Sequence, residues 1–288
     1  SFMDTLVNIF PSNFISPMVE ANMLQVIVMA IILGFAIILV GEKNVRVVNA
    51  FNDLNEIFMK CMEMILKLSP IGVFCLLCPV IASNGPTIIG SLAMVLLAAY
   101  ICYFVHAVVV YSLTVSTLGG MSPVKFFKGM MPAIMFAFSS ASSVGTLPLN
   151  LECVKKLGAK KDVASFVLPL GATINMDGTS IMQEVAVVFA AQAFGIHLSM
   201  TDYITVIGTA TLASIGTAGV PSVGLVTLTM VFNSVGLPVE AIGLIMGIDR
   251  ILDMTRTAVN ITGDAVCTTI VAHQNKALDK NVFYAEEN

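Results

Sequence analysis

The chain has 288 residues, of which 57% are hydrophobic and 11% are charged, and its mean hydropathy is +0.92. Soluble globular domains carry about 25% charged residues, so the composition excludes that class and indicates a polytopic helical membrane protein. The formal net charge of −4 decides little, because the positions of Lys and Arg, not their sum, determine membrane orientation.

The first half of the sequence predicts three transmembrane helices after a polar N-terminal segment at 1–20. Apolar runs at 23–40, 62–82 and 88–118 are each long enough to cross a bilayer as a helix. Residues 41–60 carry several charges in an amphipathic pattern, and we expect them at the membrane interface.

Basic residues predict the orientation of these helices. Two of the 14 Lys and Arg lie in a charged segment near the C-terminus, and the other twelve form four clusters, at 43–67, 125–128, 155–161 and 276–280. The loops at 83–87, 195–202 and 233–240 have none. Because Lys and Arg mark the cytoplasmic side, the three helices should cross inward, outward and inward.

Two later segments cannot be single crossings. Segment 129–154 has basic loops on both flanks, at 122–128 and 155–161, and a Ser/Gly/Pro-rich centre. We interpret it as a re-entrant helical hairpin entered from the cytoplasm. Segment 203–235 is the mirror case, because neither flank has Lys or Arg and its centre is again Ser/Gly/Pro. Two kinked ordinary helices would instead put one lysine cluster on the wrong side of the membrane.

The two hairpins have similar tips, Ser143-Val-Gly-Thr146 and Ser214-Ile-Gly-Thr217, and a polar-bearing span follows each one, at 164–194 and 241–272. The predicted fold class is therefore an all-α polytopic membrane protein, with transmembrane helices plus two oppositely oriented re-entrant hairpins in an inverted repeat. Non-helical backbone at membrane depth must be buried or line a cavity. The two tips should meet near the midplane and hold a ligand between them.

The last span carries charges at regular intervals. Polar residues follow each other by four, three, four and four positions, which places them on one helical face: Asp249, Asp253, Arg256, Asn260 and Asp264. Each charge at the centre of a span costs about 2.5–3.5 kcal/mol on insertion scales. This face must therefore look onto other protein groups, ions or a ligand. An Asp/Arg ion-pair network that only holds helices together is the alternative.

The available groups complement an acidic amino acid. Backbone N–H groups at the hairpin tips, with the hydroxyls of Ser142 and Ser143, suit a carboxylate. Arg256 offers a planar fork for a second carboxylate, and Asp253 stands one turn away for an ammonium. A second, anionic set suits a hard monovalent cation and consists of Asn175, Asp177, Asn260 and Asp264. The Cys and His pattern supports no transition-metal site, and we expect no cofactor.

Three motifs resemble the glutamate/aspartate transporter family of dicarboxylate/amino acid:cation symporters. They are Asn-Met-Asp-Gly-Thr at 175–179, Ser-Ile-Gly-Thr-Ala-Gly-Val-Pro at 214–221, and Asp-x3-Asp-x2-Arg-Thr-x2-Asn-x3-Asp at 249–264. The resemblance runs from about Pro11 to Ala272. It implies a sodium-coupled elevator symporter for aspartate or glutamate, a multi-pass homotrimer in the plasma (cell inner) membrane, with no enzymatic activity and no nucleic-acid partner.

The resemblance also implies that the chain consists of three functional parts. Residues 1–118 would be scaffold-type helices and the third span, residues 119–276 the transport core, and residues 277–288 a cytoplasmic tail. Family members have about three more helices before the point where this sequence starts.

By matching motif positions, the resemblance implies a substrate-binding set of Ser142, Ser143, Thr179, Gly219, Val220, Asp253, Arg256, Thr257 and Asn260, to which we add Arg250 of the last span. One sodium site would use Gly171, Asn175, Asn260 and Asp264. A second would use Thr173, Ser214, Ile215 and Thr217, largely through carbonyls, and a third would use Asn175 and Asp177.

Two residues depart from the family pattern. Ala141 stands where many prokaryotic members carry Arg, and Gln183 stands where proton-coupled animal members carry Glu, which argues against proton coupling. Glu184 points about 100° away around the helix. The alternatives are a symporter for C4-dicarboxylates or for other amino acids (neutral ones or cystine), an ion channel, and an enzyme built on a dyad of Asp177 and Asp264.

Overall fold

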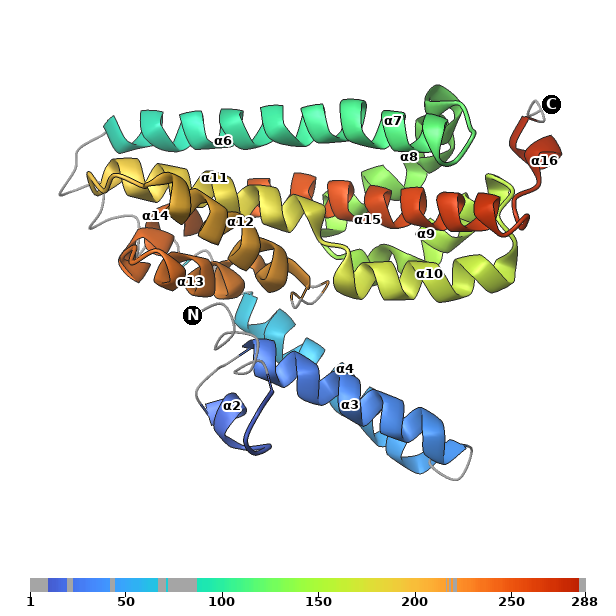
Figure 1. The fold of residues 1–288 in the computed structure, drawn as a ribbon, viewed down its shortest axis with the longest axis horizontal. Coiled ribbons are helices and arrows are strands. Elements are labelled where there is room, and N and C mark those ends of the chain that lie inside the picture. The colour runs from blue at the N-terminus through green and yellow to red at the C-terminus, as the bar shows by residue number, and fades with distance from the viewer. Residues whose placement is uncertain are drawn as a thin grey trace. The chain divides into compact units, whose positions relative to one another are not determined.

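The computed structural model describes residues 10–19, 23–41, 45–66, 71, 87–215, 217, 219 and 222–284. The regular elements of this described part are helices, with a single isolated β-bridge, which confirms the predicted all-α class. The chain divides into two compact units, Ser1–Ser83 and Asn84–Asn288 (Figure 1). The proposed functional division at 118/119 is a separate prediction.

The first unit contains α2 (Ser16–Val19), α3 (Met23–Val40) and α4 (Val45–Leu66). Helix α3 has the bounds predicted for the first span. Helix α4 extends the predicted interfacial segment to Leu66, so the start of the predicted span at 62–82 belongs to α4 instead. The rest of that span lies outside the described residues, apart from residue 71.

The second unit opens with one long helical rod that consists of α6 (Thr87–Val105), the π-helical segment η2 (His106–Tyr111) and α7 (Ser112–Thr117). Within the described residues, the stretch Gly90–Thr117 is the one helix both long and apolar enough to cross a bilayer. The predicted span at 88–118 is therefore confirmed as a helix, although the π-helical segment inside it was not predicted.

The predicted first hairpin consists of α8 (Pro123–Ser140) and α9 (Ser143–Lys156), which pack against each other. Ala141 ends α8 in the left-handed conformation, and the Ser142 hydroxyl caps α9 by accepting a 3.0 Å hydrogen bond from Gly145 N. The basic residues at 122–128, predicted as a loop, form the start of α8 because Pro123 suits the first helical turn.

The segment predicted as a span at 164–194 contains two helices, α10 (Lys161–Ile174) and α11 (Asp177–Ala193), and whether it crosses the membrane stays a prediction. Asn175 and Met176 leave helical geometry between them. The side chains of Asn175 and Asp177 form hydrogen bonds with other helices, and these bonds stabilise the break relative to a continuous helix. Asp177 begins α11, where a carboxylate complements the helix dipole.

The predicted second hairpin consists of α12 (Met200–Ile215) and α13 (Gly224–Ser234), which also pack against each other. In the first turn of α12, Asp202 accepts hydrogen bonds from Ser199 Oγ and N, at 2.7 and 2.8 Å, which hold the pKa of that carboxyl below its usual value.

The last span is likewise interrupted. A short η3 (Val239–Ala241) and α14 (Ile242–Met246) precede the 26-residue α15 (Asp249–Gln274), so the predicted continuous run at 241–272 is broken at Gly247 and Ile248. Helix α15 packs against α6, α8, α9, α10 and α11 and is the centre of the second unit (Figure 1).

The chain then folds back onto the loop between α9 and α10 before ending in α16 (Lys280–Tyr284). Lys160 N donates to Ala277 O at 2.9 Å, and Asp279 N donates to Gly158 O at 2.8 Å. The close approach of Asp279 and a φ of +94° both require glycine at position 158.

Candidate functional site

The charged face of α15 points into the protein. Its five polar residues are all buried, with exposed fractions of 3% or less: Asp249, Asp253, Arg256, Asn260 and Asp264. This burial agrees with the prediction that the face avoids lipid. Asp253 forms an ion pair with Arg256, three residues further along the helix, so part of the internal network of the alternative interpretation is present as well.

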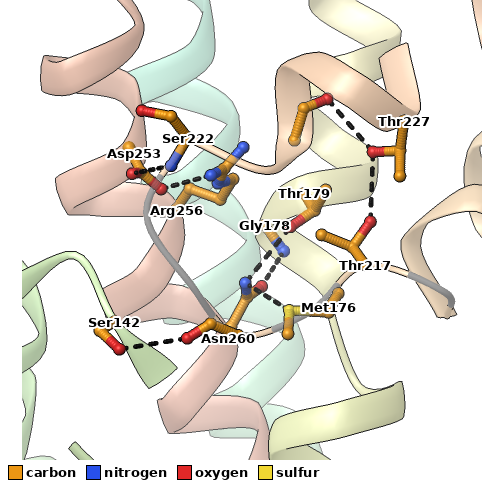
Figure 2. Close-up of polar contacts among 12 residues, drawn as sticks. Ser142, Met176, Gly178, Thr179, Thr217, Ser222, Thr227, Asp253, Arg256 and Asn260 are labelled. Atoms are coloured by element: carbon orange, nitrogen blue, oxygen red, sulfur yellow. Dashed lines mark hydrogen bonds and ion pairs between the residues drawn. The ribbon is translucent and has the colours of Figure 1, made fainter. Parts of the chain in front are cut away.

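The Asp253–Arg256 pair lies against the second hairpin, as Figure 2 shows. Asp253 Oδ1 pairs with Arg256 Nη2, and Asp253 Oδ2 accepts a 2.8 Å hydrogen bond from Ser222 N. A Cβ placed on Gly224 would lie 1.7 Å from Arg256 Nη1, so only glycine leaves room for the guanidinium. Nη1 is buried and has no hydrogen-bond partner among the described residues, which leaves a donor available to an anionic ligand.

Asn260, one turn further along α15, engages the start of α11. Its Oδ1 accepts from Gly178 N at 2.8 Å, and its Nδ2 lies 3.1 Å from Met176 Sδ and 3.4 Å from Thr179 Oγ1 (Figure 2). A Cβ on Gly178 would lie 2.6 Å from Arg256 O. The glycine of the Asn-Met-Asp-Gly-Thr motif therefore allows two backbones to approach closely.

The two hairpin tips meet, as predicted. Gly219 O accepts from Ser142 Oγ at 3.1 Å and from Val144 N at 3.2 Å. Ser143 is buried beside them, whereas Val220 lies outside the described residues. The two similar tetrapeptides lie at different places relative to the break between the helices of their pair. Ser143–Thr146 follows the break between α8 and α9 and begins α9, whereas Ser214 and Ile215 precede the break between α12 and α13 and end α12.

The structure brings the first predicted sodium-site set together. Asn175 Nδ2 donates to Asp264 Oδ1 at 3.0 Å and lies 3.5 Å from Asn260 O. A Cβ on Gly171 would lie 2.7 Å from Asp264 Oδ1, so the glycine is pressed against that carboxylate. Asp264 Oδ2 is buried with no hydrogen-bond partner in the described part of the chain.

The second predicted set is less closely connected. The hydroxyls of Thr173, Ser214 and Thr217 each bond to a backbone carbonyl of the preceding turn, at 2.9, 2.8 and 2.8 Å. The Thr217 hydroxyl also contacts Thr227 Oγ1 at 3.2 Å (Figure 2). Helix α10, which carries Thr173, contacts α12, which carries Ser214 and Ile215, and Thr217 follows the end of α12. Any cation held here would depend on carbonyl oxygens, as the resemblance implies.

Within the described residues, no three His, Cys, Asp or Glu side chains lie close enough to hold a metal ion together. A cation site in this region would thus rest on single carboxylates aided by amide and backbone oxygens. Such oxygen ligands suit a hard cation better than a soft transition metal.

Two further predicted residues of α15 differ in their exposure. Arg250 is exposed and donates to Ser139 O at the end of α8, at 3.3 Å. Thr257 is buried on α15 next to Arg256.

Some contacts of the site were not expected from the sequence. Asp177 Oδ2 lies 2.8 Å from the Tyr111 hydroxyl and 3.2 Å from His106 Nε2. Gln183 Nε2 donates to Thr227 Oγ1 at 2.8 Å, which ties α11 to α13. The sequence signal that could have indicated the contacts with Asp177 is the presence of His106 and Tyr111, five residues apart, in an otherwise apolar helix.

Gln183 and Glu184 face different surroundings. Gln183 is fully buried against the second hairpin. Glu184 lines a groove of about 850 Å³ between α6 and α11, together with Ser91, Met94 and Phe189. The prediction that the side chains of Gln183 and Glu184 point in different directions is confirmed.

Comparison with known sequences identifies relatives over nearly the whole chain. Excitatory amino acid transporter 2 of mouse is 41% identical over 259 residues, which cover 89% of this chain and 45% of the relative. The proton/sodium-glutamate symport protein of Bacillus subtilis is 32% identical, with 94% and 63% covered. The proton/glutamate-aspartate symporter of Escherichia coli is 32% identical, with 99% and 65% covered.

The chain thus spans about half to two thirds of the length of the curated relatives that it matches. The family and these relatives are integral membrane transporters rather than enzymes. The sequence pattern of one family covers residues 1–274, which are all but the last residues of the chain. The chain belongs to the sodium:dicarboxylate symporter family.

Proposed function

We propose that this chain is part of a sodium-coupled symporter that takes up an acidic amino acid, aspartate or glutamate, across the plasma membrane. The observation that carries the proposal is the buried Arg256, which pairs with Asp253 through Nη2 and keeps Nη1 without a partner among the described residues. A carboxylate can bind the planar guanidinium, and Asp253 can bind an ammonium. An acidic amino acid carries both groups.

The proposed substrate site lies between the two hairpin tips. Ser142, Gly219 and Ser222 approach from the tips, and Asn260 and Thr179 form the opposite wall. The similarity to glutamate and glutamate-aspartate transporters supports this assignment. The site would also use Ser143, Val220 and Thr257, as the family motifs imply, together with Arg250.

Sodium would bind beside the substrate. Asp264, Asn175, Gly171 and the Asn260 carbonyl form the best-connected candidate site, because a buried carboxylate oxygen there has no partner among the described residues. Asp177 would serve a further site. The carbonyls near Thr173 and at 214–217 would form another.

The wider architecture is also a proposal. Helix pairs α8–α9 and α12–α13 would be re-entrant hairpins of opposite orientation, related as an inverted repeat. Residues 119–276 would move as the transport core of an elevator against a scaffold that includes 1–118, in a homotrimer, with 277–288 in the cytoplasm. Single cysteine residues placed at 143 and 223, probed from either side of the membrane, would test the hairpin orientations.

Uptake of radiolabelled aspartate into proteoliposomes, with and without an inward sodium gradient, tests the function. We expect uptake only with the gradient, and competition by glutamate but not by succinate. Succinate uptake instead would make the protein a C4-dicarboxylate symporter, since Asp253 would then have no ammonium to bind.

Arg256→Cys tests the substrate assignment. Loss of a charged partner costs at least tenfold to hundredfold in affinity, so the variant should lose aspartate binding while it retains or gains small neutral amino acids such as serine. Undiminished aspartate binding by Arg256→Cys would contradict the assigned role.

A further inference from the structure

The π-helical segment His106–Tyr111 interrupts an otherwise α-helical rod of the second unit. Such segments are rare and occur frequently at functional sites. In an α-helix, residues five apart point about 140° away from each other. Here the rings of His106 and Tyr111 pack edge to face, with centroids 4.7 Å apart and an interplanar angle of 77°. The wider helical turn thus brings both side chains to one side of the rod.

Both side chains reach the same carboxylate oxygen. The Tyr111 hydroxyl lies 2.8 Å and His106 Nε2 lies 3.2 Å from Asp177 Oδ2, at the start of α11. The backbone of α15 allows this approach, because a Cβ on Gly263 would lie 2.7 Å from the Tyr111 hydroxyl oxygen and 3.1 Å from Asp177 Oδ2. Three helical elements therefore converge on one acid.

The Tyr111 hydroxyl has a second acceptor within reach. Its oxygen lies 3.1 Å from Val259 O on α15 as well as 2.8 Å from Asp177. A hydroxyl carries one hydrogen, so it donates mainly to one acceptor at a time. The hydrogen can turn from Asp177 to Val259 O without leaving the hydroxyl unsatisfied.

We propose that Tyr111 and His106 form a donor pair that competes with the coupling cation for Asp177. This inference rests on the proposed sodium-coupled function, in which Asp177 is a cation ligand. A hard cation binds carboxylate oxygen directly, at the place that the two donors now occupy. When the cation binds, the Tyr111 hydrogen turns to Val259 O. When the cation leaves, the hydrogen returns to the carboxylate.

The donor pair would stabilise the Asp177 carboxylate in the cation-free state of the carrier. After the cation is released, its carboxylate ligand stays at membrane depth, where an uncompensated charge is costly. Donors that replace the cation stabilise this form, weaken cation affinity and speed release. A residue that only packs helices together would act in the opposite direction, because its loss would loosen the site and weaken cation binding.

The test is the sodium affinity of the purified protein, measured both by the sodium-dependent rise in melting temperature and by the sodium dependence of uptake. Tyr111→Phe and His106→Leu each remove one donor. Each should lower the half-saturating sodium concentration about tenfold, equivalent to about 1.4 kcal/mol, and should lower the maximal uptake rate. His106→Gln keeps an N–H donor, so its half-saturating sodium concentration and its maximal uptake rate should both stay close to the wild-type values.

Tyr100→Phe is the matched control. It removes a hydroxyl from the same helix, whose hydrogen bond goes to Ile251 O at 3.1 Å and not to Asp177. Its sodium affinity should stay at the wild-type value. Weaker or unchanged sodium binding in both Tyr111→Phe and His106→Leu would overturn the proposal. Absence of any sodium effect in the wild-type protein would instead contradict the proposed function.

Discussion

Gly178→Ala probes the closest backbone approach in the candidate site. The new Cβ would lie 2.6 Å from Arg256 O and 3.1 Å from Asn260 Oδ1. The first contact is about 0.8 Å shorter than ordinary van der Waals contact, which begins at 3.4 Å. Because that partner is a backbone atom, no side-chain rotation can relieve the overlap, and α11 must move away from α15.

The expected magnitude follows from two contributions. Overpacking in a tight interior costs about 1–3 kcal/mol, and the 2.8 Å hydrogen bond from Gly178 N to Asn260 Oδ1 would lengthen, with a loss of about 0.5–1.5 kcal/mol. Together they amount to about 2–4 kcal/mol, or a loss of substrate affinity of about 30-fold or more if the whole cost falls on the binding-competent form.

Substrate titration at saturating sodium measures this effect, with the melting temperature recorded in parallel. Gly208→Ala is the matched control, because a Cβ at that position in α12 meets no atom within 4 Å. It should leave affinity unchanged and can stabilise the helix by up to about 1 kcal/mol. Wild-type affinity and stability in Gly178→Ala would refute the assignment of a functional close approach at this glycine.

Substitutions at three further positions test neighbouring contacts. Asp264→Asn should raise the half-saturating sodium concentration at least tenfold, while substrate affinity recovers at high sodium through linkage; a persistent loss would make Asp264 a substrate or structural residue. Gln183→Glu should make uptake pH-dependent and strongest in acid, because the protonated acid resembles the amide that donates to Thr227 whereas the ionised form buries an unpaired charge; a flat pH profile would count against this. Ser222→Pro removes the N–H that bonds Asp253 and excludes the observed φ of +60°, so the substrate affinity should fall tenfold or more. Ser222→Gly keeps the N–H and allows this φ, so it should bind substrate normally. Equal substrate affinities of the two variants would exclude a role for this N–H.

The sequence allowed much of the architecture to be predicted because its signals are local. Charges at regular spacing placed five residues on the buried face of α15, and Ser/Gly/Pro-rich centres located the breaks between α8 and α9 and between α12 and α13. The basic clusters predicted loops, but Pro123 and the residues after it are helical, because a cluster of lysines marks a side of the membrane and not an absence of helix.

The remaining features depend on contacts between distant segments. Asn175 interrupts α10–α11 because its amide bonds Asp264, which lies 89 residues away in the sequence. The π-helical segment places Tyr111 on Asp177 across 66 residues, and the apolar sequence from Ala107 to Val110 contains no sign of it. Local propensity predicts a continuous α-helix both around Asn175 and across the π-helical segment. Tertiary hydrogen bonds determine the observed departures from the α-helix.

In the proposed symporter, Asn260 would offer a physical route for coupling between substrate and sodium. Its side chain accepts from Gly178 N and approaches Thr179, at the proposed substrate site, whereas its backbone oxygen lies 3.5 Å from Asn175 Nδ2, at the proposed cation site. Asn175 lies in the break between α10 and α11 and Gly178 lies in the first turn of α11, so a shift of that break changes both sets of contacts together. Coupling of this kind is reciprocal, because sodium must raise substrate affinity by the same factor by which substrate raises sodium affinity. A break held from both sides by one residue therefore favours loading of the two ligands as a unit.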